Sequence, residues 1–360
     1  MKAGTIMTII GIVLILLGCL IFVGSMGSKN FDFSMLSSEK FEQKTYTTEE
    51  AFQSICIDED YGVDIKLLPS TDGICKIEYP ESKNVLCEIS VENGTLKIKQ
   101  TDNRRWYQMI GFFFNIPTLT VYLPASEGQT LNLEASTSDV TIPADLSFEN
   151  LKIRLSTGNV TVSANVTENL EIEVSTGNVK VSDCAPASVS LTTTTGRIEA
   201  TTIHATGDVY VQSSTGRQIL NDVTCVNATL ISLTGDKEIS ALTVSETLTA
   251  ESGTGDQSYT DVTCTSANLR ASTGYVKMAN LIASGHLRVE TTTGSISFDR
   301  CDAASINVTT DTGAVTGTFR TPKIILAHSD TGKVDVPRST EGGICEITTD
   351  TGRISISYAE

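Results

Sequence analysis

The three histidines have the side chains whose ordinary pKa lies nearest neutral pH, so we consider acid–base chemistry there first. His204, His286 and His328 lie 8, 12 and 15 residues after the preceding glycine of a repeated Thr-Gly pair. Because these offsets differ, the three imidazoles cannot share one row or one site. The sequence also lacks a nucleophile elbow, a phosphate-binding loop and zinc-ligand spacing. It therefore predicts a protein that is not an enzyme, with no catalytic residues and no cofactor.

Three aspartates are candidates to bind a cation. Asp311, Asp330 and Asp350 stand directly before Thr-Gly, where most earlier repeats carry Ser or Thr. A carboxylate there can cap the backbone two residues further on, as a hydroxyl does. Carboxylates one repeat apart also repel by about 1 kcal/mol per pair in water. We expect the capping role and add the hypothesis of a weak calcium site, since calcium prefers oxygen ligands.

Three polar side chains interrupt an apolar position. Regular repeats place Val or Ile two residues after the glycine, whereas three consecutive repeats place Gln218, Lys237 and Gln257 there. A buried stack of polar groups is costly unless every group is hydrogen-bonded. We therefore expect a local bulge that turns these side chains outward. The alternative interpretation is a polar groove on one face.

All these positions lie in successive copies of one repeating unit, whose period is 19 or 20 residues. Threonine precedes the glycine in every unit. A fixed period of this size is typical of a solenoid, in which each repeat buries its apolar face by stacking on its neighbours. The glycines are Gly158, Gly177, Gly196, Gly216, Gly235, Gly255, Gly274, Gly294, Gly313, Gly332 and Gly352.

Strand alternation fills each repeat. Apolar residues stand five and seven positions before the glycine, as Ile153 and Leu151 do, and alternation resumes after it at Val160 and Val162. Thr-Gly then marks a corner between two strands, where glycine suits a positive φ. Such repeats are too short for a helical crossover. We expect an all-β fold, a right-handed parallel β-helix preceded by one transmembrane helix.

The N-terminus is strongly apolar. No charged residue occurs between Lys2 and Lys29, and Ile6–Val23 would span about 27 Å as a helix, close to the bilayer's hydrocarbon thickness. We expect a single-pass anchor in residues 1–28, with a cytoplasmic N-terminus and the solenoid outside the cell membrane. A cleaved signal peptide and a lipidated Cys19 are the alternatives.

Three further regions follow the anchor. We expect a polar connector in residues 29–50, an irregular β region or cap in 51–135 and the regular solenoid in 136–360. Asn93-Gly94 predicts a hairpin inside the cap. A dense aromatic run in the cap is expected to plug the first repeat, and the alternative is a contact surface for a membrane or partner protein. Its residues are Trp106, Tyr107, Phe112, Phe113 and Phe114.

Charge and cysteine spacing limit the function further. The net charge of −17 with scattered cations argues against nucleic-acid binding. Five of the nine cysteines follow one another at intervals of two repeats. The backbones of successive members should therefore be at least about 9.5 Å apart, which is too far for a disulfide bond. We expect free, mostly buried thiols at these positions, which are Cys184, Cys225, Cys264, Cys301 and Cys345.

Three short segments and the repeat together resemble a known bacterial family. The segments Ile74–Tyr79, Val91–Ile98 and Ile116–Pro124, with the recurring Ser-Thr-Gly-x-Val, are similar to DUF4097 proteins, described as "putative adhesins". The resemblance covers roughly residues 48–358. It implies a β-solenoid, often behind an N-terminal transmembrane helix, in envelope proteins, and it brings no catalytic residues.

The sequence thus predicts a membrane-anchored, extracytoplasmic, non-catalytic protein of the bacterial cell envelope. We expect it to act as an adhesin-like binding or scaffold rod whose partners are the membrane and an envelope protein or glycan. A sensor or regulatory partner in an envelope-stress system is the alternative. A polysaccharide-processing enzyme fits less well, because such chemistry needs clustered ionisable groups in a cleft.

Overall fold

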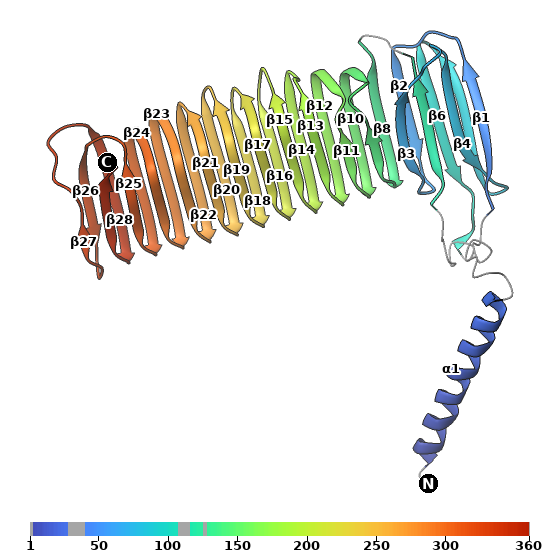
Figure 1. The fold of residues 1–360 in the computed structure, drawn as a ribbon, viewed down its shortest axis with the longest axis horizontal. Helices are drawn as coiled ribbons and strands as arrows, with labels where there is room; N and C mark the ends of the chain where they lie inside the picture. The colour runs from blue at the N-terminus through green and yellow to red at the C-terminus, as the bar shows by residue number, and fades with distance from the viewer. Residues whose placement is uncertain (1–2, 28–39, 107–115, 125–127, 360) are drawn as a thin grey trace.

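The computed structural model describes residues 3–27, 40–106, 116–124 and 128–359. These form one helix and a continuous series of strands that stack into a rod (Figure 1). Within the part of the chain that the structure describes, no helix is found that is long and apolar enough to cross a membrane. The helix is α1, Ala3–Gly27.

The first nine strands form one end of the rod. Antiparallel pairs join β1 to β4, β4 to β7, and β5 to β6. These strands are β1 Glu42–Thr48, β2 Ser54–Glu59, β3 Asp64–Pro69, β4 Cys75–Glu81, β5 Val85–Glu92, β6 Thr95–Asp102, β7 Thr118–Leu123, β8 Thr130–Thr137 and β9 Val140–Ile142.

Regular coils begin after β9, each built from two strands around a Thr-Gly corner. Their strands are β10 Ser147–Thr157, β11 Val160–Val162, β12 Asn165–Thr176, β13 Val179–Cys184, β14 Ser188–Thr195, β15 Ile198–His204, β16 Val209–Thr215, β17 Gln218–Cys225, β18 Ala228–Thr234, β19 Lys237–Val244, β20 Thr247–Thr254, β21 Gln257–Cys264, β22 Ser266–Thr273, β23 Val276–Thr293, β24 Ile296–Thr312, β25 Val315–Phe319, β26 Lys323–Ser329, β27 Val334–Asp335, β28 Gly343–Thr351 and β29 Ile354–Tyr358.

Two parallel strand pairings join the cap to the solenoid. Strand β2 pairs with β8, Ile55 opposite Leu131, and β3 pairs with β9, Ile65 opposite Val140. The hairpin predicted at Asn93-Gly94 is confirmed, since both residues have positive φ and β5 pairs with β6 across them.

Strand β1 lies within residues 29–50, where we expected only a polar connector. Only its last part turns inward, where Tyr46 packs against the core and Thr48 is buried. Its full length pairs with β4, from Glu42 opposite Glu81 to Thr48 opposite Cys75.

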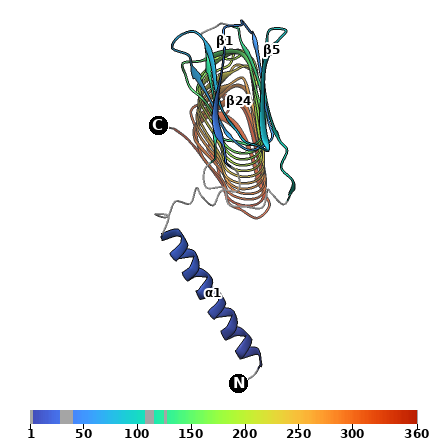
Figure 2. The same ribbon diagram turned by 90° about the vertical axis from the view of Figure 1, so that its right-hand side faces the viewer.

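The coils stack in parallel, and this confirms the all-β solenoid. Each strand pairs with its counterpart one repeat later, as Ile172 does with Leu191 in β12 and β14. The residues five positions before the corner glycine face inward and are almost fully buried, Ile153 at 0% and Ile172 at 1% exposure. Figure 2, which looks along the rod, shows the coils superposed around a narrow interior.

Each Thr-Gly corner is a point of very close approach between coils. Gly196 has φ 149°, and a Cβ on it would lie 1.9 Å from the carbonyl oxygen of Gly177 in the preceding coil. Both the backbone conformation and the contact therefore require glycine. A second corner uses non-glycine residues with φ between 49° and 59°: Asp183, Thr202, Asp222, Ala241, Asp261, Asn280 and Arg300.

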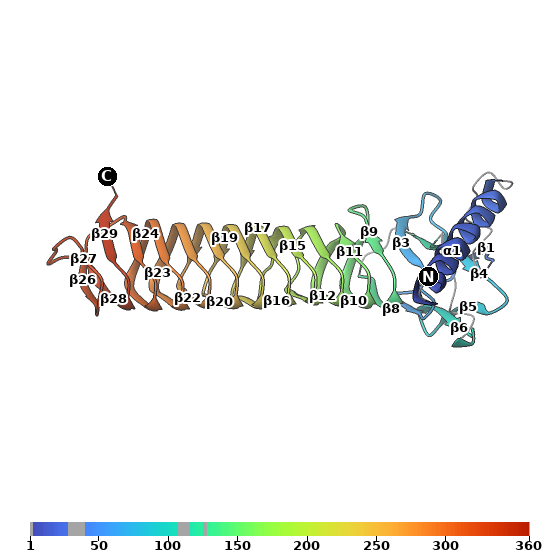
Figure 3. The ribbon, with the colours of Figure 1, turned by 90° about the horizontal axis from the view of Figure 1, so that it is seen from below.

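The last two coils are stacked out of chain order, which the sequence did not indicate. Strand β28 pairs with both β24 and β26, so the coil of residues 343–358 lies between its two predecessors. The end coil containing β26 and β27 is outermost (Figure 3). The inserted coil is apolar inside, with Cys345 and Ile354 at 0% exposure, whereas Val334 of the end coil is 38% exposed.

The solenoid cysteines are buried, as predicted. Cys184, Cys225, Cys264, Cys301 and Cys345 have free thiols in the structure. Cys225 lies opposite Val244 of the next coil in the same ladder. Burial raises the pKa of these thiols, to about 12 for Cys225, so they stay protonated and unreactive at neutral pH.

Replacing a corner glycine should be far more damaging than replacing a glycine of positive φ in open space. We expect Gly196→Ala to lower the free energy of unfolding by at least about 3 kcal/mol, because strain and overpacking act together. Gly94→Ala is the control, since Gly94 has φ 74° and a Cβ added to it would meet nothing within 4 Å; we expect a loss of about 1 kcal/mol there. Urea unfolding followed by circular dichroism measures both, and equal losses would contradict the close contact.

Candidate functional site

A continuous row of exposed threonines runs along the rod. All but the first, Thr137, precede a corner glycine, and they lie in register, Thr176 opposite Thr157 and Thr195. We name this row the Ser-Thr ridge, together with the small polar residues that precede many of the threonines. Its threonines, all exposed, are Thr137, Thr157, Thr176, Thr195, Thr215, Thr234, Thr254, Thr273, Thr293, Thr312 and Thr351.

The backbone holds the ridge rigidly. The N–H of each corner glycine from Gly158 to Gly313 donates to a ridge carbonyl of the adjoining coil, as Gly158 does to Thr176 at 2.9 Å and Gly177 to Thr195 at 2.8 Å. Parallel strands therefore set the hydroxyl groups about 4.8 Å apart. Each hydroxyl can both donate and accept a hydrogen bond. The ridge therefore presents hydrogen-bonding groups at a regular spacing along the rod.

The side chains beside the ridge form hydrogen bonds between neighbouring coils. Asn159 donates from its backbone N–H, at 2.7 Å, and from Nδ2, at 3.1 Å, to Asp139 Oδ1. Asn178 repeats both contacts one coil later, with Asn159 Oδ1 as the acceptor. This ladder ties neighbouring coils together and is a structural feature of the corner.

The polar residues Gln218, Lys237 and Gln257 face inward, so the expected bulge is wrong. All three have 0% exposure and lie opposite one another in successive coils. Burial is tolerated because each side-chain nitrogen donates to a main-chain carbonyl of the following coil. The contacts are Gln218 Nε2 to Ile231 O at 2.6 Å, Lys237 Nζ to Glu251 O at 2.8 Å and Gln257 Nε2 to Arg270 O at 2.6 Å.

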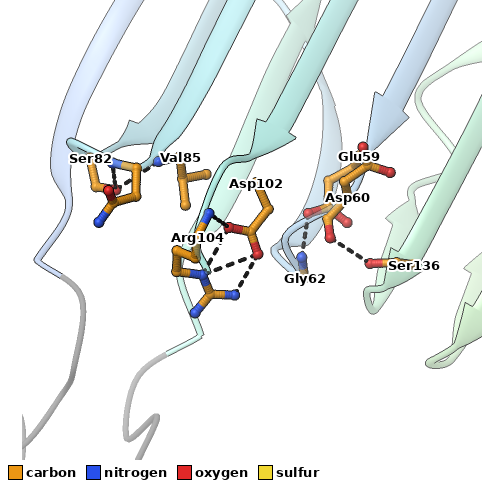
Figure 4. Close-up of polar contacts among 9 residues, drawn as sticks. Glu59, Asp60, Gly62, Ser82, Val85, Asp102, Arg104 and Ser136 are labelled. Carbon is orange, nitrogen blue, oxygen red and sulfur yellow. Dashed lines mark hydrogen bonds and ion pairs between the residues drawn. The ribbon is translucent and has the colours of Figure 1, made fainter. Parts of the chain in front are cut away.

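An acidic pocket of about 450 Å³ lies where the cap meets the first coils. Arg154 supplies its positive charge and forms ion pairs with Glu134 at 3.7 Å and Glu173 at 3.3 Å. Nearby, Ser136 Oγ donates to the carbonyl oxygen of Asp60 at 3.1 Å (Figure 4). These contacts join strands that are distant in the sequence.

Glu59 is the buried acid of this pocket, at 1% exposure. Its carboxylate accepts hydrogen bonds from the backbone N–H of Gly62 and from Ser138 Oγ, the latter at 3.0 Å. Burial raises the pKa of Glu59, and the two hydrogen bonds only partly offset this effect. Glu59 therefore fixes the turn at Gly62 against the first coil, as the dashed contact in Figure 4 shows.

An ion pair beside this turn steadies the end of β6. Arg104 binds Asp102 in a bidentate manner, with Nε at 2.9 Å from Oδ1 and Nη2 at 2.7 Å from Oδ2 (Figure 4). Its guanidinium also lies 4.3 Å from the ring centroid of Tyr61. The Arg104 contacts lower the pKa of Asp102 although burial alone would raise it.

The three aspartates do not stack in the expected order. Asp350 lies between the other two, because β28 is inserted between β24 and β26. All three are exposed, and Asp330 Oδ1 is 2.9 Å from His328 Nε2. Among the described residues no group of three or more His, Cys, Asp or Glu side chains could hold a metal ion. Calcium binding at Asp311, Asp330 and Asp350 remains a prediction.

The structure keeps the histidines apart, as their offsets indicated. His204 Nδ1 is 3.2 Å from Thr224 Oγ1 and His286 forms a hydrogen bond with Ser305, each on the surface.

Trp106 of the aromatic run is 74% exposed. Tyr107, Phe112, Phe113 and Phe114 lie outside the described residues, so the plug and the contact surface both remain predictions.

The fold defines a class, a β-solenoid with an antiparallel cap. Residues 52–213, which include most of the cap and the first coils, match the family model described as Toastrack DUF4097. The resemblance seen in the sequence is therefore confirmed over this segment.

Solved structures of low identity align with most of the chain. A Parabacteroides distasonis protein named "putative adhesin" is 12% identical, with TM-score 0.32 and coverage of 89% of this chain and 98% of that one. A Bacteroides fragilis "putative adhesin" is 14% identical, with TM-score 0.28 and coverage of 88% and 97%. A Parabacteroides distasonis "Putative lipid binding protein" is 11% identical, with TM-score 0.29 and coverage of 88% and 97%. No curated protein matches the chain.

Neutralising the buried acid should change the pH dependence of stability. Because the folded-state pKa of Glu59 is raised above 4.5, the folded protein holds a proton that the unfolded chain releases. Stability from this group is thus present below pH 4.5 and lost as pH rises through the folded-state pKa. We expect Glu59→Gln to be more stable than the wild type at neutral pH and similar to it below pH 4.5.

Thermal midpoints across this pH range measure the effect. Glu134→Gln is the control, since Glu134 is an exposed acid of the same pocket. A Glu59→Gln variant whose midpoint follows the wild type at every pH would contradict the assigned burial cost.

Proposed function

We propose that this chain is a non-catalytic, adhesin-like binding or scaffold protein of the bacterial cell envelope. The observation that carries the proposal is the Ser-Thr ridge, an exposed row of identical side chains held in register from Thr137 to Thr351. Such a row offers many equivalent weak contacts, so affinity grows with the length of ligand engaged. A long, repetitive partner such as an envelope glycan suits this surface. The names of the aligned adhesins agree with this role.

The N-terminal segment supports attachment to the membrane. No charged residue occurs between Lys2 and Lys29, and α1 covers Ala3–Gly27. We propose a single-pass anchor with a cytoplasmic N-terminus, because Lys2 and the terminal amine precede the apolar stretch. The solenoid would then extend outside the cell membrane.

Removing ridge hydroxyls should weaken binding without unfolding the rod. We expect the triple variant Thr215→Val, Thr234→Val, Thr254→Val to lose at least about tenfold in glycan affinity, since each lost hydrogen bond contributes about 1 kcal/mol. Valine keeps the shape and strand propensity of threonine. The measurement is binding of the full chain, solubilised in mild detergent, to an array of bacterial envelope glycans.

A second threonine row serves as the control for this experiment. Thr224, Thr243 and Thr263 also lie in register, on β17, β19 and β21. Their replacement by valine should leave binding unchanged. An equal loss in both triple variants, or none in the ridge variant, would argue against the ridge as the binding surface.

The anchor proposal predicts tight membrane association. The full chain should remain with membranes after an alkaline carbonate wash, and a variant lacking residues 1–28 should be released. Replacing Ile6–Val23 with an unrelated apolar stretch of equal length should restore retention, because the bilayer selects for apolarity and length. Release of the full chain would contradict the anchor. The intact mass separates an uncleaved chain from a cleaved or lipidated one.

A further inference from the structure

The middle of the rod encloses an amine beside a carboxamide. Lys237 and Gln257 are partners in the parallel ladder of β19 and β21, so their backbones lie about 4.8 Å apart. Both side chains point inward and have 0% exposure, as does Tyr259, which follows Gln257 on the same face of β21. The three side chains therefore lie on one buried face of two adjoining coils.

The amine of Lys237 is held by two hydrogen bonds. Nζ donates to Glu251 O at 2.8 Å and to Ser232 Oγ. A neutral amine has two N–H bonds, which these two acceptors satisfy, and its lone pair is left over. Burial lowers the pKa of Lys237 to about 7 despite the nearby Glu251 carboxylate. A large fraction of the amine is thus unprotonated at neutral pH, as nucleophilic attack requires.

The carboxamide of Gln257 is activated by a neighbouring phenol. Tyr259 Oη donates to Gln257 Oε1 at 2.5 Å. Burial raises the pKa of Tyr259, so its hydroxyl stays protonated and remains a donor. A donor aimed at a carbonyl oxygen stabilises the negative charge that develops there during attack. By contrast, Gln218 Oε1 is buried with no hydrogen-bond partner among the described residues.

We propose that Lys237 and Gln257 are joined by an intramolecular isopeptide bond. Lys237 Nζ forms a bond to Gln257 Cδ, and the Cδ–Nε2 bond breaks. One amine proton passes to the departing NH2 group, which leaves as ammonia, so the reaction needs no oxidant or cofactor. Tyr259 stabilises the oxygen of the tetrahedral intermediate. The dry interior keeps water from competing for the same carbon.

The cross-link would tie two adjacent coils at the middle of the rod. It would close a loop of one repeat, and cross-links of this kind stabilise chiefly by restricting the unfolded chain. It would also convert a buried, partly charged amine into a neutral amide, which removes the cost of burying the charge.

A tryptic digest of the denatured full chain tests the proposal. Trypsin cleaves after Arg217, Lys237 and Arg270, with no other Lys or Arg between these residues. An unmodified chain yields two peptides, 218–237 and 238–270. An amidated Lys237 is not cleaved, so we expect one peptide, 218–270, lighter than its sequence mass by one ammonia. Two peptides of unmodified mass in the wild type would overturn the proposal.

Variants separate the roles of the three residues. Gln257→Leu should restore cleavage after Lys237, whereas Gln218→Leu, the control in the coil on the other side of Lys237, should leave the bond intact. Tyr259→Phe should slow bond formation about a hundredfold, as loss of an oxyanion donor does. A bond that persists in Gln257→Leu would contradict the assigned acceptor. Should a variant fail to fold, the wild-type digest still decides the question.

Discussion

The contact between corner glycines is the constraint on which the rest of the rod depends. At Gly177, Gly216 and Gly294 a Cβ would lie 1.8 Å from a carbonyl oxygen of the adjoining coil. No side chain fits there, so consecutive coils meet at these points in one register only. Once the corners are fixed, the strand residues on either side of each corner fall directly over their counterparts, and the register shifts lie further away, as between Phe148 and Asn150. The buried apolar rows and the exposed Ser-Thr ridge both follow from this alignment.

Much of the fold was predictable because a single repeating pattern encodes it. The inward positions of Ile153 and Val160 follow from alternation on either side of Thr-Gly, and both are buried as expected. The second corner was not predictable, because the residues with positive φ there include Ala241 and Arg300 beside three aspartates, so no single residue type marks it. The order of the last two coils could not be predicted either. Both carry the same Thr-Gly motif, at Gly332 and Gly352, so the motif does not show which of them stacks on the preceding coil.

The candidate sites were harder to predict than the fold, since polarity alone does not show where a hydrogen-bond partner lies. Lys237 and its neighbours were expected outside because a buried stack of polar side chains is costly unless every group is hydrogen-bonded. Their partners are backbone carbonyls of the next coil, such as Glu251 O. The ridge threonines were visible as a motif, but their exposure depends on the strand geometry before each corner. Glu59 gave no signal in the sequence, because Ser138 approaches it from a distant repeat.

The exchanged order of the last two coils has a consequence for how the chain reaches its final form. During synthesis the coil with β26 emerges before the coil with β28, yet β28 occupies the place directly beside β24. The rod can therefore extend coil by coil behind the ribosome only as far as β25. Residues 323–335 must wait, or must leave a temporary position, until residues 343–358 have been made. The coils containing β26 and β28 must therefore reach their places together and not one after the other in chain order.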